Sequence, residues 1–274
     1  MGCACFAITD PDRNNQAGQV WRRYPGLVAG SLHPPLKLLY RICDDLAIYW
    51  VDRDNRSVSE PMQPPPAERR IAMWHYYDRR IAYREPGAKN VLSYFLGMGA
   101  SADLDEIEEE LDAVRRLLRG LPTTTYLDIG CGPTGEFTSQ LPGTGCALDQ
   151  SEAALRQLGQ RCPRLPRLRA DSMHLPVADN SIGRVFISHL YGLLLPDESA
   201  ELLTEVRRVA DEMVILDSGR PPGTEREGWQ TRSLPDGTSY PIFRRHFDVE
   251  TLADEICGEP MFNGQYFVLA SAPC

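Results

Sequence analysis

The segment Tyr126–Gly135 joins a strand-like apolar run to a turn that carries three glycines. Gly130, Gly132 and Gly135 leave the main chain open, because a Cβ atom at such a turn would block the close approach of a ligand. A turn with this glycine spacing can bind a cofactor close to its backbone. By itself it is a weak signal, since it also fits a nicotinamide dinucleotide site or a tight turn without a ligand.

Three carboxylates stand at the ends of three successive predicted strands beside this turn. Asp128 can reach an ammonium group, whereas it would repel a pyrophosphate. Asp149 occupies the position from which an acidic side chain takes two ribose hydroxyls. Asp171 can accept a hydrogen bond from an adenine amino group. Ammonium, ribose and adenine without phosphate describe S-adenosylmethionine (SAM), so the set predicts a site for SAM.

Strands alternate with helices from residue 124 onward, which predicts an α/β fold with a mainly parallel sheet and helices on both faces. Strands are expected at residues 125–129, 146–148, 168–170, 184–188 and 213–216, and helices at residues 103–119, 151–161 and 196–209. Asn263 and Gly264 suit the two positive φ values of a type I′ turn, so the last two strands are expected to form an antiparallel hairpin.

Four stretches between about residues 124 and 218 resemble the class I SAM-dependent methyltransferases, including the ubiquinone/menaquinone-type small-molecule enzymes. They are LDIGCGPTG, CALDQSEAAL, ADSMHLPVADNSIGRVFISHLYGLL and VRRVADEMVILDS. The resemblance implies a Rossmann-like, seven-stranded, mainly parallel sheet with an antiparallel C-terminal strand. It also implies cofactor contacts from Asp128, Gly130, Gly132, Gly135, Asp149, Gln150, Asp171, Ser172, Met173 and Ser188. The loop departs from the commonest G-x-G-x-G form, because Pro133 and Thr134 separate its second and third glycines.

Few side chains are candidates for catalysis, because methyl transfer depends mainly on holding the nucleophile and the methyl group in line. His189 directly follows the fourth predicted strand, where it is either a general base or a cap for a neighbouring backbone group. Tyr191, in the same loop, either takes part in catalysis or forms a wall of the pocket. Asp217 and Ser218 end the fifth strand and are expected to face the same pocket.

Residues 219–247 interrupt the core pattern with a predicted hairpin around Pro235-Asp236-Gly237, which we interpret as a lid over the acceptor. Arginines in this hairpin can bind an acidic acceptor through bidentate contacts, and a solvated hairpin face is the alternative. Aromatic residues before the core could form the opposite wall. The expected acceptor contacts are Tyr76, Tyr77, Trp229, Arg232, Arg244 and His246.

The chain is expected to consist of an N-terminal extension, residues 1–66, and a methyltransferase domain, residues 67–274. The domain divides into a helical cap (67–120), a SAM-binding core (121–218) and the lid hairpin (219–247). The net charge of −9 argues against a general nucleic-acid binder. No apolar run is long enough to span a bilayer, and the scattered cysteines predict reduced thiols in the cytoplasm without a metal site.

The predicted function is SAM-dependent transfer of a methyl group to an oxygen or nitrogen atom of a small-molecule acceptor, in bacterial specialised metabolism. One alternative is a SAM-binding protein that catalyses another reaction or serves as a scaffold. A less favoured alternative is an NAD-dependent oxidoreductase, against which Asp128 and Asp171 argue. Whether the chain forms a homodimer is left open.

Overall fold

The computed structural model describes residues 66–82 and 104–274, and all of them belong to the unit Pro65–Cys274. The predicted N-terminal extension, residues 1–66, therefore falls almost wholly outside the described residues. Residues 83–103 of the predicted cap also fall outside them.

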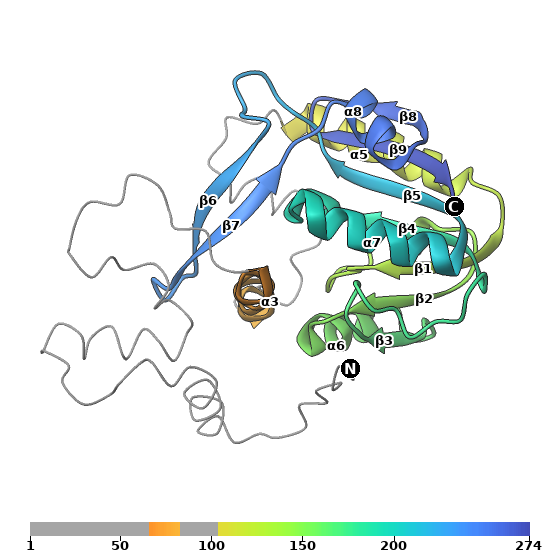
Figure 1. The fold of residues 1–274 in the computed structure, drawn as a ribbon, viewed down its shortest axis with the longest axis horizontal. Coiled ribbons are helices and arrows are strands. Elements are labelled where there is room, and N and C mark those ends of the chain that lie inside the picture. The colour runs from red at the N-terminus through yellow and green to blue at the C-terminus, as the bar shows by residue number, and fades with distance from the viewer. Residues whose placement is uncertain (1–65, 83–103) are drawn as a thin grey trace, which may run out of the picture. The chain divides into compact units, whose positions relative to one another are not determined.

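Seven strands form a sheet in the order β3-β2-β1-β4-β5-β9-β8 (Figure 1). The strands are β1 (Thr124–Ile129), β2 (Gly143–Asp149), β3 (Arg167–Arg169), β4 (Ile182–Ser188), β5 (Ala210–Ser218), β8 (Glu259–Asn263) and β9 (Phe267–Pro273). The first five are parallel, whereas β9 is antiparallel to both β5 and β8. This confirms the predicted mainly parallel sheet with an antiparallel C-terminal strand. The order reverses between β1 and β4, and such a switch point places a ligand site at the carboxyl ends of these strands.

Helices cover both faces of the sheet, because successive side chains of a strand point to opposite sides. The helices that flank the sheet are α5 (Leu104–Arg119), α6 (Glu152–Arg161), α7 (Pro196–Val209) and α8 (Val249–Ile256). Leu127 and Ile129 of β1 pack in one buried cluster with α7 and α8. Tyr126 of the same strand packs in a second cluster with α5. In the described segments, no helix is long and apolar enough to cross a membrane.

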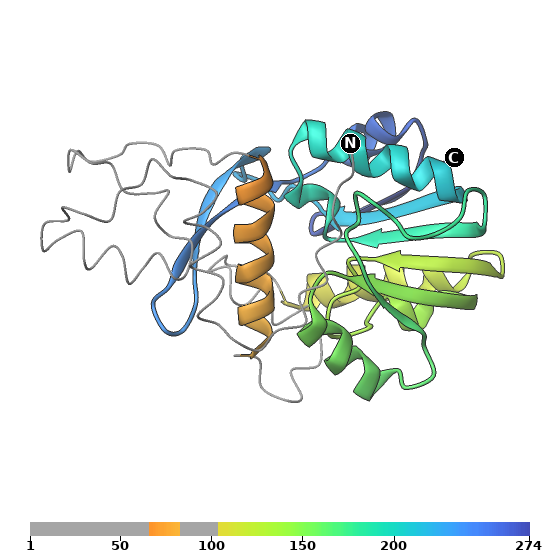
Figure 2. The same ribbon diagram turned by 60° about the horizontal axis from the view of Figure 1, so that its bottom comes forward.

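The insertion after β5 is a two-stranded hairpin of β6 (Glu227–Ser233) and β7 (Ser239–Arg245), as predicted. Gly237 closes its turn with a φ of 85°, a conformation that favours glycine. Helix α3 (Pro66–Ala82) lies beside this hairpin in both views (Figures 1 and 2). The predicted helical cap of residues 67–120 is thus divided, since α3 packs on the hairpin while α5 covers the sheet.

The C-terminal hairpin of β8 and β9 is present, but its predicted two-residue type I′ turn is wrong. Asn263 ends β8, and neither Asn263 nor Gly264 has a positive φ. The turn is shaped by Glu110 of α5 instead. The carboxylate of Glu110 accepts hydrogen bonds from the backbone N–H groups of Gln265, Tyr266 and Phe267, at 2.6, 2.9 and 3.0 Å. A side chain far away in the sequence therefore decides the geometry of this turn.

We expect Glu110→Ala to lower the free energy of unfolding by about 1–3 kcal/mol, because it leaves partly buried N–H groups of the turn without their acceptor. Urea denaturation followed by circular dichroism measures the change. The matched control is Glu109→Ala, since Glu109 is exposed on the same helix. Equal stabilities for the two variants would contradict this role of Glu110.

Candidate cofactor and acceptor site

A cavity of about 250 Å³ opens at the carboxyl ends of β1, β2, β3 and β4, next to the switch point of the sheet. Its walls come from the glycine turn after β1, from the ends of β2 and β3, from the loop after β4 and from α3. Predicted cofactor residues that line it are Gly130, Gly132, Asp149, Gln150, Asp171, Ser172, Met173 and Ser188. Most of the predicted cofactor set is thus brought to one place.

The three glycines of the turn have φ values of 71°, 61° and 63°, but they face different surroundings. A Cβ atom on Gly132 would have no atom within 4 Å, so this part of the main chain is open. A Cβ atom on Gly135 would lie 2.6 Å from Cδ1 of Leu158 in α6. Gly135 does not line the cavity, in contrast to the prediction, because its missing side chain makes room for helix packing.

Asp149 at the end of β2 holds the glycine turn and the start of α6 together. Its Oδ2 accepts a hydrogen bond from the N–H of Gly132 at 3.0 Å, and its Oδ1 accepts one from the N–H of Ser151 at 2.8 Å. Burial raises the pKa of Asp149, while these two backbone donors lower it. Each oxygen keeps a further lone pair, so the carboxylate can also accept from a ligand hydroxyl in the cavity.

Asp171, after β3, is fixed by its neighbours on the cavity wall. Its Oδ1 accepts hydrogen bonds from Nε2 of Gln150 and from the N–H of Met173, both at 3.0 Å. Its Oδ2 lies 3.8 Å from Nη1 of Arg70 on α3 and 3.7 Å from Nδ1 of His174. The buried Ser172 and Met173 complete this end of the cavity, which offers both acceptors and donors.

Asp128 differs from its predicted place, because it lies beneath the surface of the cavity. Its carboxylate accepts a hydrogen bond from the hydroxyl of Thr138, and Thr138, not Asp128, lines the cavity. Burial raises the pKa of Asp128 to about 7, although the bond from Thr138 lowers it. Oδ1 of Asp128 is buried and has no hydrogen-bond partner among the described residues.

His189 lines the cavity directly after β4, in a left-handed backbone conformation with a φ of 53°. Its Nδ1 lies 3.4 Å from the hydroxyl oxygen of Ser218 and 3.9 Å from Oδ1 of Asp217. Burial lowers the pKa of His189 to about 4, and the nearby charge of Arg244 lowers it further, while Asp217 raises it. The imidazole is therefore neutral at pH 7.

Tyr191, the second predicted catalytic residue, points away from this cavity. Its hydroxyl donates to Oε2 of Glu255 at 3.2 Å, and burial raises its pKa to about 12. It lines a second cavity of about 470 Å³ with His246, a predicted acceptor contact. His246 lies 3.2 Å from the backbone oxygen of Glu225, and burial lowers its pKa to about 4. Both residues are therefore separated from the predicted cofactor set.

The other predicted acceptor contacts are divided between the cavity and the packing around it. Tyr77 lines the cavity, and its hydroxyl accepts a hydrogen bond from Nη1 of Arg232 at 3.2 Å. Tyr76 is buried between α3 and the hairpin, and Trp229 packs on the ring of Phe243. Arg244 is fully buried and pairs with Asp217. Of the six predicted contacts, only Tyr77 lines the cavity.

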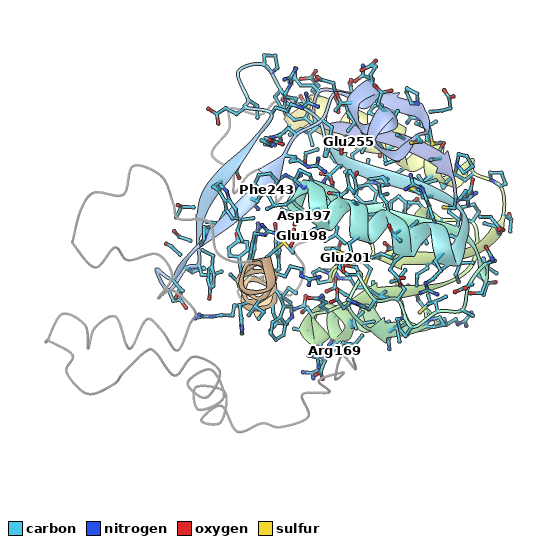
Figure 3. The ribbon with its side chains drawn as sticks, in the orientation of Figure 1. Arg169, Asp197, Glu198, Glu201, Phe243 and Glu255 are labelled. Carbon is cyan, nitrogen blue, oxygen red and sulfur yellow. The ribbon has the colours of Figure 1, made fainter. Side chains whose placement is uncertain are left out.

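Helix α3 supplies cavity residues at helical spacing on one face, of which only Tyr77 was assigned from the sequence. The others are Arg70, Met73, Trp74, Arg80 and Ile81. Polar contacts attach α3 to the core: among them, Arg69 pairs with Glu198 at 2.6 Å, and the Ser151 hydroxyl donates to Asp78 at 2.5 Å. Figure 3 shows Glu198 at the end of α7 that faces α3. The i, i+3, i+4, i+7 spacing from Arg70 onward was the signal that could have revealed this wall.

Within residues 66–82 and 104–274, no group of three or more His, Cys, Asp or Glu side chains is arranged to hold a metal ion. The polar groups that line the cavity at the carboxyl ends of β1 to β4 suit an organic ligand. They include carboxylates and an amide, and apolar and aromatic side chains from α3 and the loop after β4 complete the lining.

Residues 127–213 match a family model described as a methyltransferase domain. The DhpI-SAM-HEP complex aligns with a TM-score of 0.58 and 16% identity, covering 76% of this chain and 99% of that chain. The DhpI-SAH complex aligns with a TM-score of 0.51 and 20% identity, covering 66% and 94%. The PH0226 protein from Pyrococcus horikoshii OT3 aligns with a TM-score of 0.50 and 15% identity, covering 66% and 99%. No curated protein matches the chain.

At these identities the structural likeness concerns the fold, and the sequence match concerns the domain that contains the glycine turn and the strand-end carboxylates. The two findings agree on the same part of the chain. Residues 127–213 thus match a methyltransferase domain, and this domain lies within a seven-stranded sheet of the Rossmann-like methyltransferase fold.

Proposed function

We propose that the chain transfers the methyl group of SAM to an oxygen or nitrogen atom of a small, largely apolar acceptor. The observation that carries this proposal is the mixed lining of one cavity, which combines the carboxylates of Asp149 and Asp171 with His189 and with apolar and aromatic side chains. We assign the two carboxylates to a first, cofactor end and His189 with the apolar side chains to a second, acceptor end. The first end suits a nucleoside with a short amino-acid tail, and the second suits an uncharged acceptor body.

The residues at the first end fit SAM. Asp149 would accept from the ribose hydroxyls, and Asp171 with Ser172 and Met173 would hold the adenine. The open main chain at Gly132 leaves room for the amino-acid part, since no atom lies within 4 Å of its missing Cβ. SAM supplies an electrophilic methyl group on a sulfonium centre. DhpI is described in complexes with SAM and with SAH, which supports this cofactor for the shared fold.

The acceptor end is enclosed mainly by apolar surface. Met73 and Trp74 of α3 face the loop residues Leu193 and Leu194, and Phe137 lies beside His189, with 6.1 Å between the two ring centroids. Such walls favour an acceptor with a flat or aliphatic body, because burial of apolar surface contributes about 25 cal/mol of binding free energy per Å². The neutral His189 would take the proton that a hydroxyl or ammonium acceptor must lose.

An acceptor panel tests this proposal. The full chain is incubated with SAM and with phenols, aliphatic alcohols, aryl amines and small carboxylic acids, and release of S-adenosylhomocysteine (SAH) is measured. We expect turnover with at least one apolar hydroxyl or amine. We also expect Trp74→Ala to raise the KM for that acceptor at least tenfold, with little change in SAM affinity.

The alternatives predict other outcomes of the same panel. SAM binding without SAH release for any acceptor would favour a scaffold or a different SAM-dependent reaction. Turnover confined to carboxylic acids would move the acceptor class to anions, and Arg70 and Arg80 would then be its candidate partners, because both line the cavity.

A further inference from the structure

A buried ion pair lies directly behind His189. Arg244 of β7 and Asp217 of β5 are both fully buried, and Nη2 of Arg244 lies 2.9 Å from Oδ1 of Asp217. Removing both charges from water is costly, and well-packed apolar residues often stabilise a core as well as such a pair does. A buried pair beside a pocket residue therefore calls for a role other than stability.

Asp217 organises the main chain around His189. Its Oδ2 accepts a hydrogen bond from the N–H of Gly192 at 2.7 Å, and its Oδ1 accepts one from the N–H of Ser218 at 2.7 Å. Gly192 belongs to the loop that follows His189, in which Leu193 lines the cavity. Asp217 thus connects the end of β5 to the loop that carries His189.

Ser218 completes the connection to the imidazole. Its hydroxyl oxygen accepts a short hydrogen bond from Nη2 of Arg244 and lies 3.4 Å from Nδ1 of His189. Arg244 therefore fixes the oxygen that faces Nδ1. The carboxylate of Asp217, 3.9 Å from the same nitrogen, favours the tautomer that carries its proton on Nδ1. In that tautomer Nε2 is the nitrogen that can take a proton.

The backbone of His189 is strained in a way that needs such support. A φ of 53° is uncommon for a residue with a side chain and persists only where the surrounding contacts over-determine it. Besides the contacts to Ser218 and Asp217, the His189 N–H donates to the carbonyl oxygen of Leu216 at 2.9 Å. Strain, a buried ion pair and a cavity-lining imidazole thus coincide at one point of the fold.

We propose that Arg244, Asp217 and Ser218 are positioning residues that hold His189 in its left-handed conformation, in one tautomer and without charge, ready to deprotonate the acceptor. This proposal rests on the proposed function. In the transfer step the acceptor oxygen or nitrogen forms a bond to the methyl carbon. The bond between that carbon and sulfur breaks, and its electron pair stays on sulfur. The acceptor proton passes to His189, which later releases it to water.

The charges around His189 support this assignment. The charged groups that face it in the described part of the chain are Asp217 and Arg244, and the rings of Phe137 and Phe267, centred 6.1 and 5.8 Å away, are uncharged. Burial and Arg244 lower the pKa of His189, and Asp217 raises it. Burial is the main reason that the imidazole is neutral, and Arg244 offsets part of the effect of Asp217.

The test is a titration of His189 by NMR in the full chain, with the pH profile of kcat/KM as a second readout. Arg244→Met removes the charge, so the pKa of His189 should rise above its value of about 4, while burial, the larger cause of the lowering, remains. Arg244→Lys keeps the charge and should restore most of the low value. The matched control is Arg245→Met, because Arg245 is buried on the same strand but pairs with Glu255 at 3.0 Å.

An unchanged pKa of His189 in a folded Arg244→Met variant would overturn the proposal, as would an equal rise in Arg245→Met. If Arg244→Met does not fold, the Ser218→Ala variant tests the proposal instead. In this variant His189 should populate both tautomers, which its ¹⁵N chemical shifts report. Because the base is then misplaced, kcat should fall about 10- to 100-fold. Unaltered ¹⁵N chemical shifts of His189 in the Ser218→Ala variant would also contradict the proposal. Because the NMR readouts need no acceptor, they separate failure of this proposal from failure of the proposed function.

Discussion

Replacing Asp149 with alanine is expected to weaken SAM binding by about 100-fold. Two ribose hydroxyls would lose hydrogen bonds to a carboxylate, and each such bond contributes about 1.5–3 kcal/mol. At the lower end of this range, two bonds contribute about 3 kcal/mol, which corresponds to a little over 100-fold in Kd. The substitution also frees the N–H groups of Gly132 and Ser151, which Asp149 holds at 3.0 and 2.8 Å. Isothermal titration calorimetry with SAM measures the change.

Two further variants make this result specific. Asp149→Asn keeps the shape of the side chain and should lose less affinity than Asp149→Ala. Asp179→Ala removes a carboxylate from a surface pair with Arg208 and should leave the Kd for SAM unchanged. An Asp149→Ala variant with wild-type affinity would show that the ribose is bound elsewhere.

Replacing His189 with alanine is expected to lower kcat by about 10²–10⁴-fold with a hydroxyl or amine acceptor, the range typical of a positioned general base. The Kd for SAM should change little, because the imidazole stands at the acceptor end of the cavity. In the wild-type enzyme, the pKa of His189 near 4 means that the ring is neutral above that pH. The rate should therefore not fall near pH 6.5, where a histidine ordinarily takes up a proton. It should fall only as the pH approaches 4.

The matched control is His246→Ala. His246 is also buried and its pKa is also lowered to about 4, but it lines the second cavity. It should therefore retain most of the activity. A carboxylate acceptor would need no base, since it is already ionised at neutral pH. Full activity of His189→Ala with a hydroxyl acceptor would refute the role of His189 as a base.

Much of the cofactor end could be predicted because it depends on local sequence. A strand, a glycine turn and a carboxylate at the next strand end place Gly132 and Asp149 together in any parallel sheet of this order. The surroundings of Asp128 could not be predicted in this way. Its position in the strand was predicted correctly, but the hydroxyl of Thr138, ten residues later, covers it on the cavity side.

The acceptor end could be predicted less well because it depends on long-range packing. The left-handed turn at His189 sends Leu190 into the main cavity and Tyr191 into the second one, a reversal that no sequence period indicates. Arg244 appeared to be a lid residue, but its partner Asp217 lies 27 residues away on β5. His189 and Tyr77 were assigned to this site from the sequence and line the cavity, whereas the helical spacing of the other cavity residues on α3 was missed.

The most direct test is a crystal structure of the full chain grown with SAH. The ribose hydroxyls are predicted to lie within hydrogen-bond distance of the Asp149 carboxylate. The adenine should lie beside Asp171, Ser172 and Met173, and the sulfur should point toward His189. Two results would contradict the assignment of the cofactor site. One is SAH bound in the cavity lined by Tyr191 and His246. The other is an open but empty cavity beside Asp149 and Asp171.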